Sequence, residues 1–268
     1  MIMINSHPSS IISPKAKIGD NVTIGPYCVI NDDVKIGNNV KLKAHVYLDG
    51  NTTIGDNCIF FPYCSIGTIP QDLKYKGEKS NLVIGSNNIF REYVTVNPGT
   101  EGGGLITSIG NNCLFMISSH IAHDCIIGNN VVMVNNASLA GHVVVEDFVI
   151  MGALSGAHQF CRIGKHSMIG GLSGVDSDVI PYGTVMGNRA YLSGLNIIGL
   201  KRRGFSKEII KNLRMVYNML FHEQGDTFAN RIKLVSKEFK ENEPVMEIIN
   251  FLNEEKSRSV CKPKNVNK

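Results

Sequence analysis

The sequence lacks any apolar run that approaches the roughly 20 residues a membrane-spanning helix requires. The segment from Met1 to Ser13 also lacks the basic region followed by a long apolar stretch that marks a secretory signal peptide. We therefore expect a cytoplasmic protein without stable insertion into a membrane.

Paired cysteines are missing too. The chain has seven cysteines, an odd number, and none of them forms a Cys-x-x-Cys motif. This argues against a disulfide framework or a zinc-ribbon site, and we interpret the cysteines as small buried residues in a reducing compartment. The chain also has no P-loop and no dinucleotide-binding glycine fingerprint.

Charge is unevenly distributed along the chain. Residues 1–200 contain 25 of the 27 glycines and carry a net charge of −2, whereas residues 201–268 hold 15 basic and 9 acidic side chains. We therefore do not expect a nucleic-acid binder that uses the whole chain, while an acidic partner for the basic tail stays open. With 43% hydrophobic residues, the chain can build a core.

A period of six residues dominates positions 1–189. An amphipathic helix recurs every three to four residues and a simple strand every two, so neither explains it. The pattern predicts a mainly β fold, a parallel β-helix of hexapeptide repeats in which three repeats form one triangular coil of about 18 residues. Gly-Asp and Gly-Asn pairs are expected to form turns because they tolerate positive φ. In the second half of the series the inward residues are Ile109, Phe115, Ile121, Ile127, Met133, Leu139, Val145, Met151, Ala157, Ile163, Ile169 and Val175.

Two segments, about 68–82 and 98–107, interrupt the period and must form loops, which are either tolerated insertions or functional segments. Residues 190–268 instead show helical signals and predict a C-terminal α-helical domain, whose end, 257–268, we expect to fray. The expected helices, each beginning at a cap or an early proline, are Ser206 to Glu223, Asp226 to Lys240 and Pro244 to Glu254.

Stacked coils predict a strip of histidines. With about 18 residues per coil, Gly141-His142 lies directly above His123-Asp124. Three interpretations stay open: a general base, His123 oriented by Asp124; a metal site; or solvated surface residues. A metal would use His120, His123 and His142, but no cysteine or carboxylate is placed as a fourth ligand, so we expect no metal. His158-Gln159 extends the strip by one more coil.

No activated nucleophile accompanies this candidate base. The chain has no Gly-x-Ser-x-Gly elbow near an acidic residue and a histidine. A base without a nucleophile indicates direct transfer, in which an acceptor hydroxyl attacks an activated donor such as a thioester. The backbone N–H of Gly141, at a coil corner, could then stabilise the developing oxyanion.

Six motifs resemble those of the bacterial acyl-ACP–UDP-N-acetylglucosamine O-acyltransferases, the family that begins lipid A synthesis. The resemblance covers nearly the whole chain. It implies a left-handed β-helix, an exception to the right-handed crossover rule, assembled as a homotrimer with active sites between subunits. The motifs are Gln71-Asp72-Leu73-Lys74-Tyr75, Gly102-Gly103-Gly104-Leu105, Ile121-Ala122-His123-Asp124-Cys125, Asn135-Asn136 with Leu139-Ala140-Gly141-His142, His158-Gln159-Phe160-Cys161 and Gly199-Leu200-Lys201-Arg202-Arg203-Gly204-Phe205-Ser206.

The resemblance also implies roles. His123 would deprotonate the sugar 3-hydroxyl with support from Asp124, Gly141 would hold the oxyanion, and Gly171 would admit a 3-hydroxyacyl chain nearer fourteen carbons than ten. An acidic acyl carrier protein would be the donor, and no metal or redox cofactor is implied. The implied substrate contacts are Asp72, Leu73, Lys74, His120 and His142 to the nucleotide sugar, His158 and Gln159 to the acyl group or sugar, and Asn196, Arg202 and Arg203 to the uridine and phosphates.

The sequence departs from the family at Asn97-Pro98, Arg189 and Ile198, where a His-Arg pair, a histidine and a glutamate are usual. Three rivals stay open. An N-acylating sister enzyme would carry a separate N-terminal uridine-binding domain, but here repeats begin by Ile12. An acetyl-CoA-dependent hexapeptide acetyltransferase would lack the Asp72 to Lys74 motif. The third rival is a β-helical scaffold with idle histidines, or a zinc hydratase.

Overall fold

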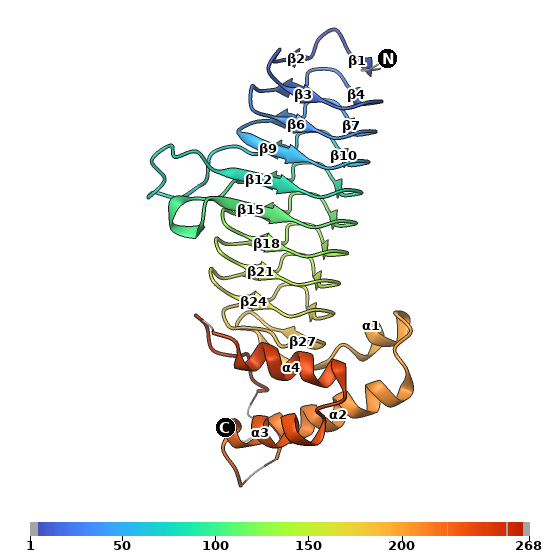
Figure 1. Cartoon of the computed structure of the whole chain (residues 1–268), viewed down its shortest axis with the longest axis vertical. Helices are drawn as coiled ribbons and strands as arrows, with labels where there is room; N and C mark the ends of the chain where they lie inside the picture. The colour runs from blue at the N-terminus through green and yellow to red at the C-terminus, as the bar shows by residue number, and fades with distance from the viewer. Residues whose placement is uncertain (1–4, 224, 256, 265–268) are drawn as a thin grey trace.

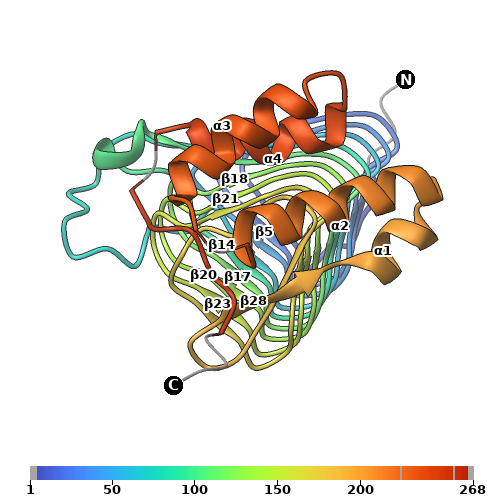
Figure 2. The ribbon, with the colours of Figure 1, turned by 90° about the horizontal axis from the view of Figure 1, so that it is seen from below.

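The computed structural model describes residues 5–223, 225–255 and 257–264. Its main feature is a left-handed parallel β-helix, a triangular prism whose three faces are sheets (Figure 1, Figure 2). From β1 to β26, strands three apart in the chain pair with each other, so consecutive strands lie on different faces; β27 and β28 both extend the face that ends with β25. The predicted fold class is confirmed.

The three faces are named by their number of strands. The eleven-stranded face contains β1 (Asn5–Ser6), β4 (Thr23–Ile24), β7 (Lys41–Leu42), β10 (Ile59–Phe60), β13 (Ile89–Phe90), β16 (Leu114–Phe115), β19 (Val132–Met133), β22 (Ile150–Met151), β25 (Met168–Ile169), β27 (Gly183–Met186) and β28 (Tyr191–Leu195). The nine-stranded face contains β2 (Ile11–Ile12), β5 (Val29–Ile30), β8 (Tyr47–Leu48), β11 (Ser65–Ile66), β14 (Thr95–Val96), β17 (His120–Ile121), β20 (Ser138–Leu139), β23 (Gly156–Ala157) and β26 (Gly174–Val175). The eight-stranded face contains β3 (Lys17–Ile18), β6 (Lys35–Ile36), β9 (Asn51–Ile54), β12 (Asn81–Ile84), β15 (Ile106–Ile109), β18 (Ile126–Ile127), β21 (Val144–Val145) and β24 (Arg162–Ile163).

The six-residue period places one apolar side chain per strand inside the prism. From Ile24 to Val175, these inward residues are at most 4% exposed. The Phe60, Phe90 and Phe115 rings stack along the axis with centroids 4.6 and 4.8 Å apart. All seven cysteines are buried and unpaired, as predicted. The prism is therefore a packed apolar core and not a channel.

The expected reason for the Gly-Asp and Gly-Asn pairs is wrong. Positive φ falls on the residue after each pair, such as Asn39 (58°) and Asn57 (59°), and not on the glycine. The glycine is required because a Cβ there would meet the backbone of the next coil. A Cβ on Gly85, for example, would lie 2.6 Å from the carbonyl oxygen of Gly110.

Both predicted loops leave the prism at the same corner. The first lies between β11 and β12, and the second, which contains the 3₁₀ turn η1 (Glu101–Gly103), lies between β14 and β15. This corner joins the nine-stranded face to the eight-stranded face, and we call it the loop corner. In Figure 1 both loops project from the left of the prism.

The helices cover the C-terminal end of the prism (Figure 2). The three predicted helices are present as α2 (Lys207–Phe221), α3 (Phe228–Glu238) and α4 (Glu243–Asn253), and a short helix, α1 (Ile197–Arg202), was not predicted. Ser206 caps α2 as expected, but Thr227, not Asp226, caps α3, because its hydroxyl accepts the N–H of Asn230. In the described part of the chain, no helix combines the length and apolarity needed to cross a bilayer.

The end of the chain does not fray where the structure describes it. Ser259 and Cys261 form backbone hydrogen bonds with Asp178 at the loop corner, and Cys261 is buried. Residues 256 and 265–268 lie outside the described residues. The division into domains after residue 189 stays a prediction, to which the structure adds that β28, beyond it, pairs with β27 of the prism.

We expect Gly85→Ala to destabilise the prism by about 1–3 kcal/mol, because the new methyl group overlaps the next coil. Asn87→Gly, at a corner where φ is 61°, should change stability by less than about 1 kcal/mol. Denaturant unfolding of both variants checks this. Equal stability of Gly85→Ala and the parent protein would contradict the stacking explanation.

Candidate active site

A cleft lies between the two loops and the loop corner. It has a volume of about 560 Å³, and its wall includes Asp72 and Lys74 of the first loop, Thr100 of the second loop, and His142 and Phe160 of the corner. The two loops come from the two coils that immediately precede the coil of His123. With the coils of His142 and Phe160, five successive coils thus contribute neighbouring parts of one site.

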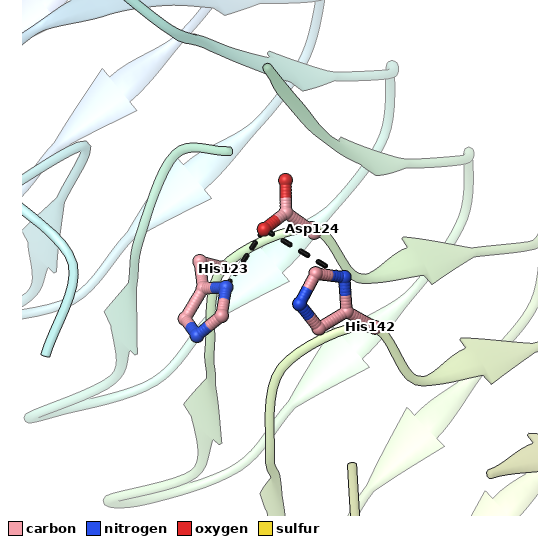
Figure 3. Close-up of side chains that lie close together, drawn as sticks. All are labelled: His123, Asp124 and His142. Atoms are coloured by element: carbon pink, nitrogen blue, oxygen red, sulfur yellow. Dashed lines mark hydrogen bonds and ion pairs between the residues drawn. The ribbon is translucent and has the colours of Figure 1, made fainter. Parts of the chain in front are cut away.

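His123 and Asp124 form the centre of this site (Figure 3). The His123 Nδ1 lies 2.7 Å from Oδ2 of Asp124. Asp124 occupies the left-handed corner position, with φ of 59°, which aspartate tolerates better than most residues. Its side chain is 1% exposed and that of His123 is 14% exposed. The carboxylate is therefore held under the second loop, while the imidazole lies beside Asp72 and His142, which line the cleft.

The Asp124 contact decides which imidazole nitrogen is free. Because a carboxylate accepts hydrogen bonds, it fixes the proton on Nδ1 of His123 and leaves the Nε2 lone pair available. Within the described residues Nε2 forms no hydrogen bond, and the Asp72 carboxylate lies 4.0 Å away. The arrangement can accept a proton from a bound hydroxyl group.

Gly141 lies against the His123 imidazole, as the coil spacing predicted. A Cβ at residue 141 would lie 2.6 Å from His123 Nε2, so only glycine fits beneath the ring. Its N–H forms no hydrogen bond with any described residue. A free N–H beside a candidate base is suitably placed to donate to an oxyanion.

The four histidines of the predicted strip divide into two pairs. His142 belongs to the cleft: it stacks on Phe160 with ring centroids 4.4 Å apart and meets the edge of His123 at 5.1 Å. Burial lowers the pKa of His142, an effect that the Asp124 charge opposes. The net shift favours the neutral imidazole.

The other pair, His120 and His158, lines an apolar hollow on the nine-stranded face, with a volume of about 510 Å³. His120 Nδ1 lies 2.7 Å from the Thr95 hydroxyl, and burial, followed by the nearby His123, lowers its pKa. His158 Nδ1 lies 2.6 Å from Nη2 of Arg258, whose Nε donates to the Gln159 carbonyl. Sequence reasoning missed Arg258 because it treated the tail as frayed.

Leu73 and Gly171, two other predicted substrate contacts, differ in their position relative to the cleft. Leu73 lines the cleft together with Asp72 and Lys74, although its side chain is fully exposed. Gly171 lies at the corner that joins the eleven- and nine-stranded faces, where an added Cβ would approach only Ala153, 3.3 Å from its carbonyl oxygen. Neither residue touches His123 within the chain.

Asn196, Arg202 and Arg203 lie on the side of the prism opposite the loops, in and beside α1 (Figure 1, Figure 2). The Asn196 side chain caps α1 and donates to the His166 carbonyl. Arg203 donates to the Phe148 carbonyl and lies over that ring, while Arg202 is exposed. Within one copy of the chain, these three residues therefore lie away from the cleft.

Asn97, a departure from the family pattern, anchors the first loop. It is 3% exposed, and its Nδ2 donates to the carbonyl oxygens of Thr68 and Ile69. Arg189 and Ile198, the other departures, are exposed.

The residues that could hold a metal ion in the structure differ from the set considered from the sequence, which was His120, His123 and His142. His120 is engaged by Thr95, and the potential ligand atoms that lie within 4.8 Å of one another belong to His123, Asp124 and His142. Asp124 already accepts hydrogen bonds from Thr100 and His123.

Comparison with known proteins identifies the family. The model for UDP-N-acetylglucosamine O-acyltransferase, domain 2, matches residues 178–261, and the bacterial transferase hexapeptide model matches 15–50, 33–68 and 106–141. An acyl-[acyl-carrier-protein]–UDP-N-acetylglucosamine O-acyltransferase of Rickettsia bellii is 54% identical over 96% of this chain and 91% of that protein. The protein of the same name from Paracoccus denitrificans is 52% identical over 76% and 77%.

The chain belongs to the UDP-N-acetylglucosamine O-acyltransferase family. The structure agrees: the UDP-N-acetylglucosamine acyltransferase of Francisella novicida superposes with a TM-score of 0.93 at 39% identity, covering 98% of this chain and 95% of that one. The protein is thus an acyltransferase with a hexapeptide-repeat β-helix.

We expect Gly141→Ala to lower acyltransferase kcat by about 10²-fold, because the methyl group displaces the His123 ring from its position beside the cleft. Gly128→Ala is the matched control: its Cβ would crowd the next coil, 2.8 Å from the Asp147 nitrogen, but away from the loop corner. Turnover per folded protein, measured for both, should fall only in Gly141→Ala. An equal loss in both variants would refute this role.

Proposed function

We propose that the protein transfers a 3-hydroxyacyl chain from acyl carrier protein to the 3-hydroxyl of UDP-N-acetylglucosamine, the first step of lipid A synthesis. The observation that carries the proposal is the His123 imidazole, fixed by Asp124 with a free Nε2 beside a cleft enclosed by two loops. The names of the relatives from Paracoccus denitrificans and Rickettsia bellii indicate the same substrates.

The proposed reaction is a direct attack. His123 Nε2 removes the proton of the sugar hydroxyl while its oxygen attacks the thioester carbonyl, and the Gly141 N–H donates to the oxyanion that forms. Collapse of this intermediate forms the ester and breaks the carbon–sulfur bond. The imidazolium returns its proton to the departing thiolate, so neither metal nor redox cofactor takes part.

The first loop supplies the nucleotide-sugar contacts. Asp72 and Lys74 line the cleft, and Asp72 lies close enough to His123 for both to contact one sugar ring. Leu73, exposed in the wall of the same cleft, is available to contact the substrate. His142 borders the same cleft, and His120, His158 and Gln159 extend the contact surface toward the apolar hollow, which suits an acyl chain.

The active assembly is a homotrimer with its sites between subunits. Asn196, Arg202 and Arg203 lie opposite the loops, so they can reach a cleft only on another copy, where the two arginines would pair with the diphosphate. An apolar surface supports close packing of copies. The outward residues of six consecutive strands on the eleven-stranded face are apolar and half-buried: Ile59, Ile89, Leu114, Val132, Ile150 and Met168.

The donor partner is an acidic carrier protein in the cytoplasm. Residues 201–268 hold 15 basic and 9 acidic side chains, an excess that attracts an acidic partner over long range. Such steering weakens as salt screens exposed charges.

We expect the purified protein to acylate UDP-N-acetylglucosamine from an acyl carrier thioester, and His123→Ala to lower kcat by about 10²–10⁴-fold because the base is lost. His7→Ala, at an exposed histidine in the first coil, is the control and should retain parent activity. Mass spectrometry of the product checks both. Comparable turnover in His123→Ala would reject the base, and stoichiometric zinc in a protein that forms no acylated product would favour the hydratase alternative.

Gly171 should set the length of the acyl chain that the enzyme accepts. We expect the parent protein to prefer a donor nearer fourteen carbons than ten, and Gly171→Met to shift this preference to shorter chains by filling the space at its corner. Leu172→Met, at the adjacent exposed position, is the matched control. Competition among thioesters of different lengths measures the preference. An unchanged preference in Gly171→Met would place the end of the acyl site elsewhere.

A further inference from the structure

The second loop is attached to the side chain of Asp124. The Thr100 N–H donates to Oδ1 at 2.8 Å, and the Thr100 hydroxyl donates to Oδ2 at 2.6 Å. The Asp124 N–H donates in turn to the Thr107 hydroxyl at 2.7 Å. Threonines from the beginning and end of one loop therefore hold the residue that orients His123.

Thr100 uses its hydroxyl in an unusual way. It is the N-cap of η1 (Glu101–Gly103), where a threonine oxygen normally accepts a backbone N–H of the turn that follows. Here no side-chain capping bond forms, and the hydroxyl donates to Asp124 instead. The Thr100 carbonyl still accepts the N–H groups of Gly103 and Leu105, at 3.1 and 2.8 Å, which keeps the loop folded tightly over the carboxylate.

The glycine at position 103 shows how closely this loop covers Asp124. A Cβ on Gly103 would overlap the Asp124 carboxylate carbon. Gly103 does not have positive φ, so its backbone conformation does not require glycine. A Cβ on Gly102, one residue earlier, would meet only the Thr100 hydroxyl, at 4.0 Å. The contact with Asp124 therefore explains glycine at position 103.

We propose that Thr100 is a positioning residue for the reaction, acting through Asp124 on His123. Its two donors satisfy both carboxylate oxygens and hold the carboxylate plane, so that Oδ2 meets Nδ1 of His123 at 2.7 Å. This keeps the imidazole turned with Nε2 toward the cleft. The second loop is then part of the catalytic apparatus, because it sets the orientation of the base. The inference rests on the function proposed above.

The test compares two substitutions of Thr100. Thr100→Val keeps the shape and the N–H but loses the hydroxyl donor, and it should lower kcat by about tenfold or more while KM for UDP-N-acetylglucosamine changes by less than about twofold. Thr100→Ser restores the donor and should recover kcat to within about threefold of the parent. Thr52→Val is the control. Thr52 is buried like Thr100, but its hydroxyl donates to the Asp49 carbonyl, and both residues lie two coils before Thr100.

A second pair of variants tests the steric contact. Gly103→Ala should lower kcat by about tenfold or more, since its methyl group displaces the Asp124 carboxylate, whereas Gly102→Ala should cause a loss at least fivefold smaller. Melting temperatures of all variants identify any general loss of structure. This pair keeps the inference testable if Thr100→Val folds poorly.

Two results would overturn the inference: a Thr100→Val variant with parent kcat, or a Thr100→Ser variant as impaired as Thr100→Val. A rise in KM with unchanged kcat would also overturn it, because Thr100 would then contribute to binding. Failure of the proposed function is distinguishable, since the parent protein itself would then form no acylated sugar nucleotide.

Discussion

The structure depends on the stacking of one coil directly on the next. Strand partners without an intervening loop are eighteen positions apart, as between Lys41 and Ile59, and backbone hydrogen bonds hold each coil to its neighbours. Because side-chain direction repeats with the coil, each residue at a corner has one defined neighbour above and one below. This repetition brings the glycines of one corner against the backbone of the next coil, and it places Gly141 against His123 at another corner.

The same constraint explains how a rigid prism acquires an active site. Regular corners are too short to enclose a substrate, so a cleft requires additional chain. Both insertions occur at the loop corner, in the two coils before His123, while Gly141, His142 and Phe160 occupy that corner in the two coils after it. The loops therefore form the wall on one side of the base, and the regular corners form the other.

The sequence predicts the periodic part of this arrangement well. The six-residue period identified the buried residues from Ile24 to Val175 and the vertical alignment of His123 with Gly141. It failed where hydrogen bonds, not periodic burial, decide the structure: Thr227 caps α3 in place of Asp226, and positive φ falls one residue beyond the expected pairs. The first-loop contacts came from family resemblance, because an aperiodic loop has no repeat from which its position could be derived.

Burial makes the carboxylate of Asp124 informative. An ionised carboxylate with a 1% exposed side chain is costly unless nearly all of its hydrogen-bonding capacity is used. One neighbouring histidine cannot supply that alone. The other donors come from Thr100, so the second loop supplies hydrogen bonds that a buried carboxylate at this position requires. A solvated aspartate would leave the imidazole free to rotate, whereas the covered one limits it to the orientation that direct transfer requires.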